Sequence, residues 1–241
     1  MAYEERYRAV FSAGAERWGH SPDDKILYST LKSWVEENDL QGKSVIEYAC
    51  GEGACGVILS ELGCRYHGVD ISPAAIEKSK NLLGKYPNAT VEILDMVKQS
   101  VKEKYDAALD CMGLHMLITD DDRKSYLKNA YNSIKDNAPM LFFRESYRQS
   151  GTYDGKVNSI DEWTRITGDD YKTPQLRQVK NSSDGRVVDV LIPLVPARAK
   201  DRNGYIEEFE NVGFGVEKFT EMNSSEAIPY SASIYVRKTA R

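Results

Sequence analysis

The feature that most constrains the fold is a regular alternation of short apolar strands and helical segments between Lys43 and Glu145. The pattern predicts strands at 44–49, 65–70, 89–94, 105–109 and 140–144, with helices at 54–62, 73–86 and 121–136. Parallel strands need a crossover connection, usually a helix, between them. We therefore expect an α/β fold with a mostly parallel sheet and helices on both faces.

The flanking segments complete this plan. Helical spacing of apolar residues predicts helices at 3–18 and 24–37, and a later helix at 202–212 precedes two strands that close an antiparallel C-terminal hairpin. Segment 146–200 is polar apart from a possible strand at 186–194, and excursions this long are often lids. We expect one domain over 1–241, divided into an N-terminal helical cap (1–40), a cofactor-binding core (43–145), a lid or substrate insertion (146–200) and the C-terminal helix and hairpin (201–241).

Composition narrows the class of protein. The net charge of −5 disfavours a broad basic face for nucleic acid, and no apolar run approaches the roughly 20 residues that span a bilayer. The four cysteines form no Cys-x-x-Cys pair and lie in or beside apolar segments, which favours buried reduced thiols. The start of the chain has no apolar signal-peptide core, so we expect a cytoplasmic protein. The acidic run 120–122 fits the start of a helix, so we expect no metal site.

Acidic residues recur where the predicted strands end, and ligands of open α/β sheets bind at those carboxyl ends. They are Glu47, Asp70, Asp95 and Asp110. Gly51 and Gly53 follow the first strand, and glycines let the backbone approach a ligand closely. Asp70 comes about twenty residues after this turn, the spacing at which a carboxylate meets the ribose hydroxyls of an adenosine. The pattern predicts a nucleoside site.

The same segments resemble the motifs of class I S-adenosylmethionine-dependent methyltransferases. The run 45–53, VIEYACGEG, resembles their first motif, although Ala49 stands where the family usually has its first glycine. The runs 68–72 and 94–96 resemble the second and third motifs, and 105–110 followed by Leu114-His115 resembles the fourth strand and the pair after it. The resemblance covers about 43–145 and implies a Rossmann-like, seven-stranded methyltransferase sheet.

The resemblance also implies roles for individual residues around S-adenosylmethionine. It places Ala49, Gly51 and Gly53 against the methionyl part, Asp70 on the ribose, and Asp95 on the adenine amine. It further implies that Glu47 lies near the cofactor's amino group. Ile71 and Met96 would flank the adenine, and Asp110 completes the expected cofactor site.

The acceptor should enter at the end of the fourth strand, near Cys111 and His115. His115 is a candidate general base, and the alternative is a histidine that packs without transferring a proton. Arg144, Arg148 and Tyr153 are candidates for holding the acceptor. An N-terminal helix with Tyr7, Phe11, Arg17 and Trp18 would close over the cofactor, as in members of the family that act on small molecules. We therefore expect a small soluble acceptor.

Two other functions stay open at this point. The run 51–56 is also a Gly-x-Gly-x-x-Gly motif, so an NAD(P)-dependent oxidoreductase is the first alternative, although the acid at Glu47 disfavours a nearby pyrophosphate. The second is a non-catalytic S-adenosylmethionine-binding protein, because a fold does not fix a function.

Overall fold

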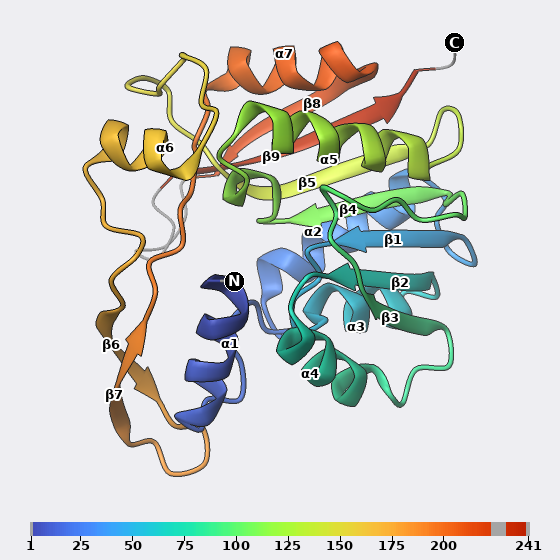
Figure 1. Ribbon diagram of the computed structural model, residues 1–241. Helices are drawn as coiled ribbons and strands as arrows, with labels where there is room; N and C mark the ends of the chain where they lie inside the picture. The colour runs from blue at the N-terminus through green and yellow to red at the C-terminus, as the bar shows by residue number, and fades with distance from the viewer. Residues whose placement is uncertain (1, 223–229, 240–241) are drawn as a thin grey trace.

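The computed structural model describes residues 2–222 and 230–239 (Figure 1). The helices are α1 (Ala2–Ser12), α2 (Lys25–Glu37), α3 (Ala54–Glu61), α4 (Pro73–Leu83), the 3₁₀ turn η1 (Leu114–Met116), α5 (Asp120–Ser133), α6 (Ile160–Thr167) and α7 (Arg202–Val212). The strands are β1 (Ser44–Tyr48), β2 (Arg65–Asp70), β3 (Ala89–Ile93), β4 (Ala107–Cys111), β5 (Pro139–Ser146), β6 (Gln175–Lys180), β7 (Val187–Ile192), β8 (Phe214–Met222) and β9 (Ser231–Lys238).

The main sheet has seven strands in the order β3-β2-β1-β4-β5-β9-β8. Strands β1 to β5 pair in parallel, whereas β9 lies antiparallel to both β5 and β8. The predicted mostly parallel sheet with an antiparallel C-terminal hairpin strand is confirmed. In Figure 1 the parallel strands all point toward the side on which α1 and α6 lie.

Helices cover both faces of the sheet, and each face has its own apolar core. Alternate residues of one strand point to opposite faces, so Val45 packs with α2 and α3 while its neighbour Ile46 packs with α5 and α7. Burial of this apolar surface on both faces is the main favourable contribution to the fold. Among the described helices, none is long and apolar enough to cross a membrane.

The N-terminal helix is shorter than predicted. We expected a helix over 3–18, but α1 ends at Ser12. Gly14 adopts a left-handed φ of +82°, and the chain then turns so that the backbone N–H groups of Trp18 and Gly19 donate to the Glu52 carboxylate. The long-range contact with the glycine turn thus replaces a further helical turn.

The insertion has more secondary structure than the sequence indicated. Its predicted strand is present as β7, but β7 pairs with β6, and α6 precedes both; neither β6 nor α6 was predicted. Helix α6 spans only 8 residues and buries one side chain, Trp163, but the sequence contained signals for it: the Ser159 hydroxyl caps its N-terminus by accepting from the Glu162 N–H, and Gly168 follows its end at φ +76°. Val179 and Ile192 of the hairpin pack against Val10 of α1, which joins the insertion to the N-terminal cap.

Two strand boundaries also differ from prediction. Strand β4 covers Ala107–Cys111 rather than 105–109, because Tyr105 forms only an isolated bridge with Ile134. Strand β5 continues to Ser146 through a register shift against β9, with Arg144 in a left-handed conformation at φ +57°. Bulges of this kind redirect side chains, and here the bulge lies beside the cavity described below.

Candidate active site

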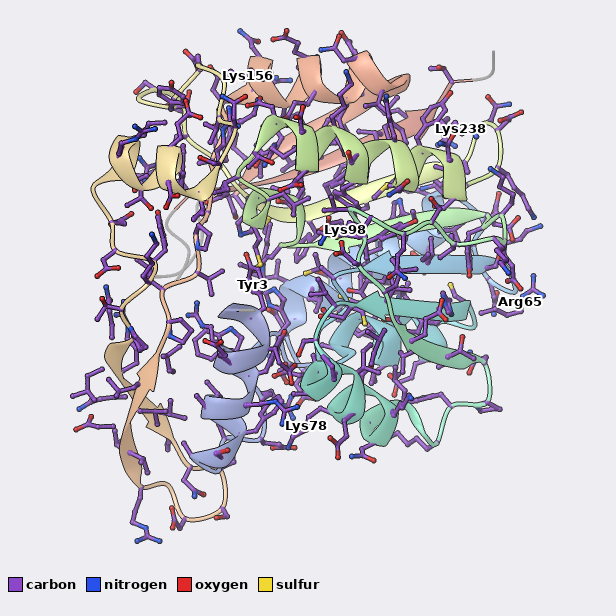
Figure 2. All side chains as sticks on the ribbon, viewed as in Figure 1. Tyr3, Arg65, Lys78, Lys98, Lys156 and Lys238 are labelled. Atoms are coloured by element: carbon purple, nitrogen blue, oxygen red, sulfur yellow. The ribbon has the colours of Figure 1, made fainter. Side chains whose placement is uncertain are left out.

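A cavity of about 710 Å³ opens beyond the carboxyl ends of β1, β2 and β4. Its volume lies within the range of roughly 300–1,000 Å³ that is usual for small-molecule sites. The glycine turn after β1, the end of β2 and the loop after β3 form one side. Helix α1 and the segment Trp18–His20 form the other, and Figure 2 shows Tyr3 at the end of α1 nearest the strand ends.

Asp70 organises the floor of this cavity. One of its carboxylate oxygens accepts a hydrogen bond of 2.9 Å from the Gly51 N–H, and the other accepts one of 2.8 Å from the Ser72 N–H. Gly51 has a φ of +53°, a conformation that favours glycine. Burial raises the pKa of Asp70, while these N–H donors act in the opposite direction. Each oxygen keeps a second lone pair for a ligand hydroxyl.

Glu47 is buried in the cavity wall and accepts a hydrogen bond of 2.5 Å from the Tyr66 hydroxyl. Burial raises the pKa of this carboxyl from its ordinary value of 4.5 to about 8. At neutral pH the side chain is therefore largely protonated in the free protein. A ligand ammonium group beside it would favour the ionised form.

The raised pKa of Glu47 gives a prediction about stability. The folded state binds this proton more tightly than the unfolded chain does. The contribution of the protonated Glu47 carboxyl to the free energy of unfolding is therefore complete below pH 4.5 and is lost as pH rises through about 8. Relative to Glu47→Gln, which keeps an acceptor for Tyr66, the wild type should lose at most about 1.4 kcal/mol of unfolding free energy per pH unit in this window. Urea denaturation from pH 5 to pH 9 measures the difference; parallel curves for the two proteins would contradict the shift.

The loop after β3 supplies the outer end of the cavity. This loop contributes Asp95 and Met96 to the lining, and Ile71 joins them from directly after the end of β2. The resemblance implied these three residues for an adenine site. One Asp95 oxygen accepts hydrogen bonds from the Val97 and Lys98 N–H groups, at 3.0 and 3.2 Å. Asp95 therefore also stabilises its own turn.

The structure brings most, but not all, of the predicted site residues to the cavity. Those that line it are Glu47, Ala49, Gly51, Asp70, Ile71, Asp95, Met96 and Arg144. Those outside its lining are Gly53, Asp110, His115, Arg148 and Tyr153. Whether the first group binds the cofactor stays a prediction, but its members share one space.

Gly53 and Asp110 have other contacts. Gly53 begins α3 at φ +87°, where a Cβ atom would lie 2.5 Å from the Ser79 hydroxyl, so the missing side chain serves the contact between α3 and α4. Asp110 accepts hydrogen bonds from the Gly113 N–H and the Tyr126 hydroxyl at 2.6 and 2.5 Å. Burial, with the nearby Glu145, raises the pKa of Asp110 well above its usual range.

His115 lies behind the cavity wall. Its Nδ1 is 2.8 Å from a carboxylate oxygen of Glu145, and its backbone N–H donates to the same oxygen at 2.8 Å. Both side chains are buried, with 6% and 0% exposure. The base role stays a prediction, and this contact supplies a structural role that competes with it.

The predicted acceptor residues lie in different environments. Arg144 lines the cavity, but its guanidinium donates to Asp24 at 2.6 Å and contacts His20 Nδ1 at 3.0 Å. Arg148 and Tyr153 are exposed, and Tyr153 packs edge-on to Trp163. Their predicted contact with the acceptor stays untested.

Sequence reasoning missed several lining residues, among them Tyr3, Arg6 and His20. Tyr3, Arg6 and Tyr7 share one helix face at i, i+3 and i+4, a signal that the sequence contained. His20 follows α1 in irregular chain, where no periodic pattern indicates its direction. Burial opposes protonation of His20, but the neighbouring Cys111 raises the pKa of its imidazole overall.

Comparisons with known proteins agree with this arrangement. A family model described as a methyltransferase domain matches residues 46–140. The chain is 41% identical over 49 residues to a ribosomal protein L11 methyltransferase from Aeromonas hydrophila, an alignment covering 20% of this chain and 17% of that protein. The chain thus spans about a sixth of the length of this relative, and the match concerns a local segment.

Solved structures match over nearly the whole chain. An S-adenosylmethionine-dependent methyltransferase from Clostridium acetobutylicum has a TM-score of 0.66 at 15% identity, covering 97% of this chain and 96% of that one. The 1,6-didemethyltoxoflavin-N1-methyltransferase of Burkholderia thailandensis has a TM-score of 0.62 at 14% identity, covering 90% and 80%. At these identities the solved structures show a shared fold. The match to a methyltransferase domain comes from the family model. Residues 46–140 therefore match a methyltransferase domain, and the chain as a whole shares the fold of S-adenosylmethionine-dependent methyltransferases.

Proposed function

We propose that this protein transfers a methyl group from S-adenosylmethionine to a small soluble acceptor. The observation that carries the proposal is the enclosure of the cavity by the chain's own N-terminal segment. Tyr3, Trp18 and His20 lie across the strand ends, and Val195 of the insertion also lines the cavity. An acceptor that enters this space must be compact, which favours a metabolite, natural product or xenobiotic over a protein chain or nucleic acid. The Burkholderia thailandensis neighbour, by its name, methylates such a small molecule.

The residues present fit the proposed cofactor. Asp70 offers carboxylate lone pairs to a ribose, Glu47 offers a carboxyl group to an ammonium, and Gly51 lets the backbone approach a ligand. When bound, S-adenosylmethionine supplies an electrophilic methyl group, and the protein supplies orientation and exclusion of water. The ring of apolar and sulfur-containing side chains at the end of β4, Cys111, Met112 and Met116, would hold the acceptor away from bulk water.

The test combines binding and turnover. We expect calorimetry to detect S-adenosylhomocysteine binding and no comparable NAD(H) or NADP(H) binding. A screen of small molecules with S-adenosylmethionine should then release S-adenosylhomocysteine for some acceptors. Preferential nicotinamide binding would favour the oxidoreductase, and cofactor affinity without turnover would favour a binding protein. Methylation of ribosomal protein L11, tested in the same assay, would contradict the small acceptor.

The lid role of 146–200 belongs to the same proposal. The β6–β7 hairpin packs on α1, and α1 lines the cavity, so closure over a ligand should order both. We expect amide exchange in 146–200 to slow when S-adenosylhomocysteine and an acceptor are added, while strand β9, which is paired on both sides within the main sheet, is unchanged. Equal exchange in the insertion with and without ligands would remove the lid role.

A further inference from the structure

Arg6 is unusual among the inward-facing arginines of this protein. The buried arginines Arg123, Arg144 and Arg198 each contact a carboxylate, respectively Glu208, Asp24 and Asp120. Among the described residues, none places a carboxylate within ion-pair distance of Arg6, and its buried Nε has no hydrogen-bond partner. Arg6 is half-buried, and a cation partly removed from water without a counter-charge is disfavoured, so this arrangement points to a ligand that supplies one.

The Arg6 side chain is nevertheless held in place. Its guanidinium carbon lies 3.8 Å from the centroid of the Trp18 ring, which covers one face of the group. Burial, together with the positive charge of Arg177, lowers the pKa of Arg6 to about 10, so the group still carries its charge at neutral pH. The cation is therefore positioned for a ligand before any ligand binds.

Neighbouring contacts show which part of the cavity Arg6 and Trp18 face. The backbone N–H of Trp18 donates to the carboxylate of Glu52, the residue after Gly51. A Cβ atom on Gly51 would lie 2.9 Å from the Tyr7 hydroxyl. Arg6 and Trp18 thus lie over the glycine turn, and both line the cavity there. By the family resemblance, the turn contacts the amino-acid part of the cofactor, which carries a carboxylate.

We infer that Arg6 binds the carboxylate of the cofactor's amino-acid part and that Trp18 holds its guanidinium in position. The inference rests on the proposed function, since it requires a cofactor in this cavity. It gives the N-terminal helix a direct part in cofactor recognition rather than only a covering one. Arg144, which also lines the cavity, does not serve as a free cation, because Asp24 already neutralises it.

The test compares ligands with and without the carboxylate. Calorimetry would use S-adenosylhomocysteine and its decarboxylated analogue, which keeps the amine, against the wild type and Arg6→Ala. We expect the substitution to weaken S-adenosylhomocysteine binding about ten- to a hundredfold, the range for hydrogen bonds to charged groups, and to leave analogue binding nearly unchanged. Arg8→Ala is the matched control, because Arg8 is exposed on the same helix and should leave both affinities unchanged.

The outcomes separate this inference from the proposed function. No binding of S-adenosylhomocysteine by the wild type would overturn the proposed function itself. Wild-type binding with equal losses for both ligands in Arg6→Ala would show that Arg6 only supports the helix, and unchanged affinities would show no contact; either result overturns the inference. Partial recovery in Arg6→Lys, which restores the charge without the planar group, would support it.

Discussion

Gly51→Val is expected to abolish cofactor binding while the protein stays folded. The residue sits at φ +53°, where a β-branched side chain is strained, and its Cβ atom would lie 2.9 Å from the Tyr7 hydroxyl. The new side chain would push α1 away and disturb the 2.9 Å hydrogen bond from the Gly51 N–H to Asp70. We expect a combined loss of about 3 kcal/mol or more in binding free energy, which is about a hundredfold or more in affinity for S-adenosylhomocysteine.

Gly42→Val provides a matched control for this effect. Gly42 also has a left-handed φ of +75°, but its Cβ atom would meet no atom of the described residues within 4 Å, and it does not line the cavity. Gly42→Val should therefore lose stability through similar backbone strain and keep its cofactor affinity. Calorimetry and circular dichroism on both variants separate strain from ligand contact. Normal binding by Gly51→Val would mean that the turn does not touch the cofactor.

The sheet and the cofactor side of the cavity could be predicted because their signals are local. Strands β1 and β2 are short runs that are each followed by a helix. Glu47 and Asp70 lie at the ends of these two strands, and Gly51 lies in the turn after β1. The carboxyl ends of parallel strands meet at one edge of the sheet, so strand order alone brings these residues together.

The end of β4 shows where local reasoning becomes ambiguous. Side chains alternate between the two faces of a strand, so of Asp110 and Cys111 only one can face the cavity. Cys111 lines it, and Asp110 points toward Tyr126 of α5. The predicted end of this strand was two residues early, and the face of each residue could not be assigned from the sequence.

The other wall of the cavity depends on contacts between distant segments. Glu52 holds the Trp18 and Gly19 backbone, Asp24 holds Arg144, and the β6–β7 hairpin packs on α1. None of these pairs follows from the period of a helix or strand. For this reason Arg6 and His20 were absent from the predicted site, although the covering role of the N-terminal helix was expected.

His115→Ala is expected to destabilise the fold rather than only slow the reaction. The substitution leaves Glu145 fully buried without the imidazole at 2.8 Å, and the second oxygen of Glu145 has no hydrogen-bond partner among the residues that the structure describes. Leaving a buried polar group without its hydrogen-bond partner typically costs about 1–3 kcal/mol. We therefore expect a large drop in the urea midpoint, with S-adenosylhomocysteine affinity retained under conditions where the variant is folded, because His115 does not line the cavity.

A double-mutant cycle distinguishes this structural role from the predicted catalytic one. If the buried Glu145 carboxyl lowers the free energy of unfolding only when His115 is absent, then adding Glu145→Gln to His115→Ala should recover part of the lost stability. A general base would give the opposite pattern: wild-type stability in His115→Ala, with turnover of an identified acceptor reduced about a hundredfold or more. Because β4 directs Cys111 to the cavity while His115 lies behind the wall against Glu145, we expect the stability effect to dominate.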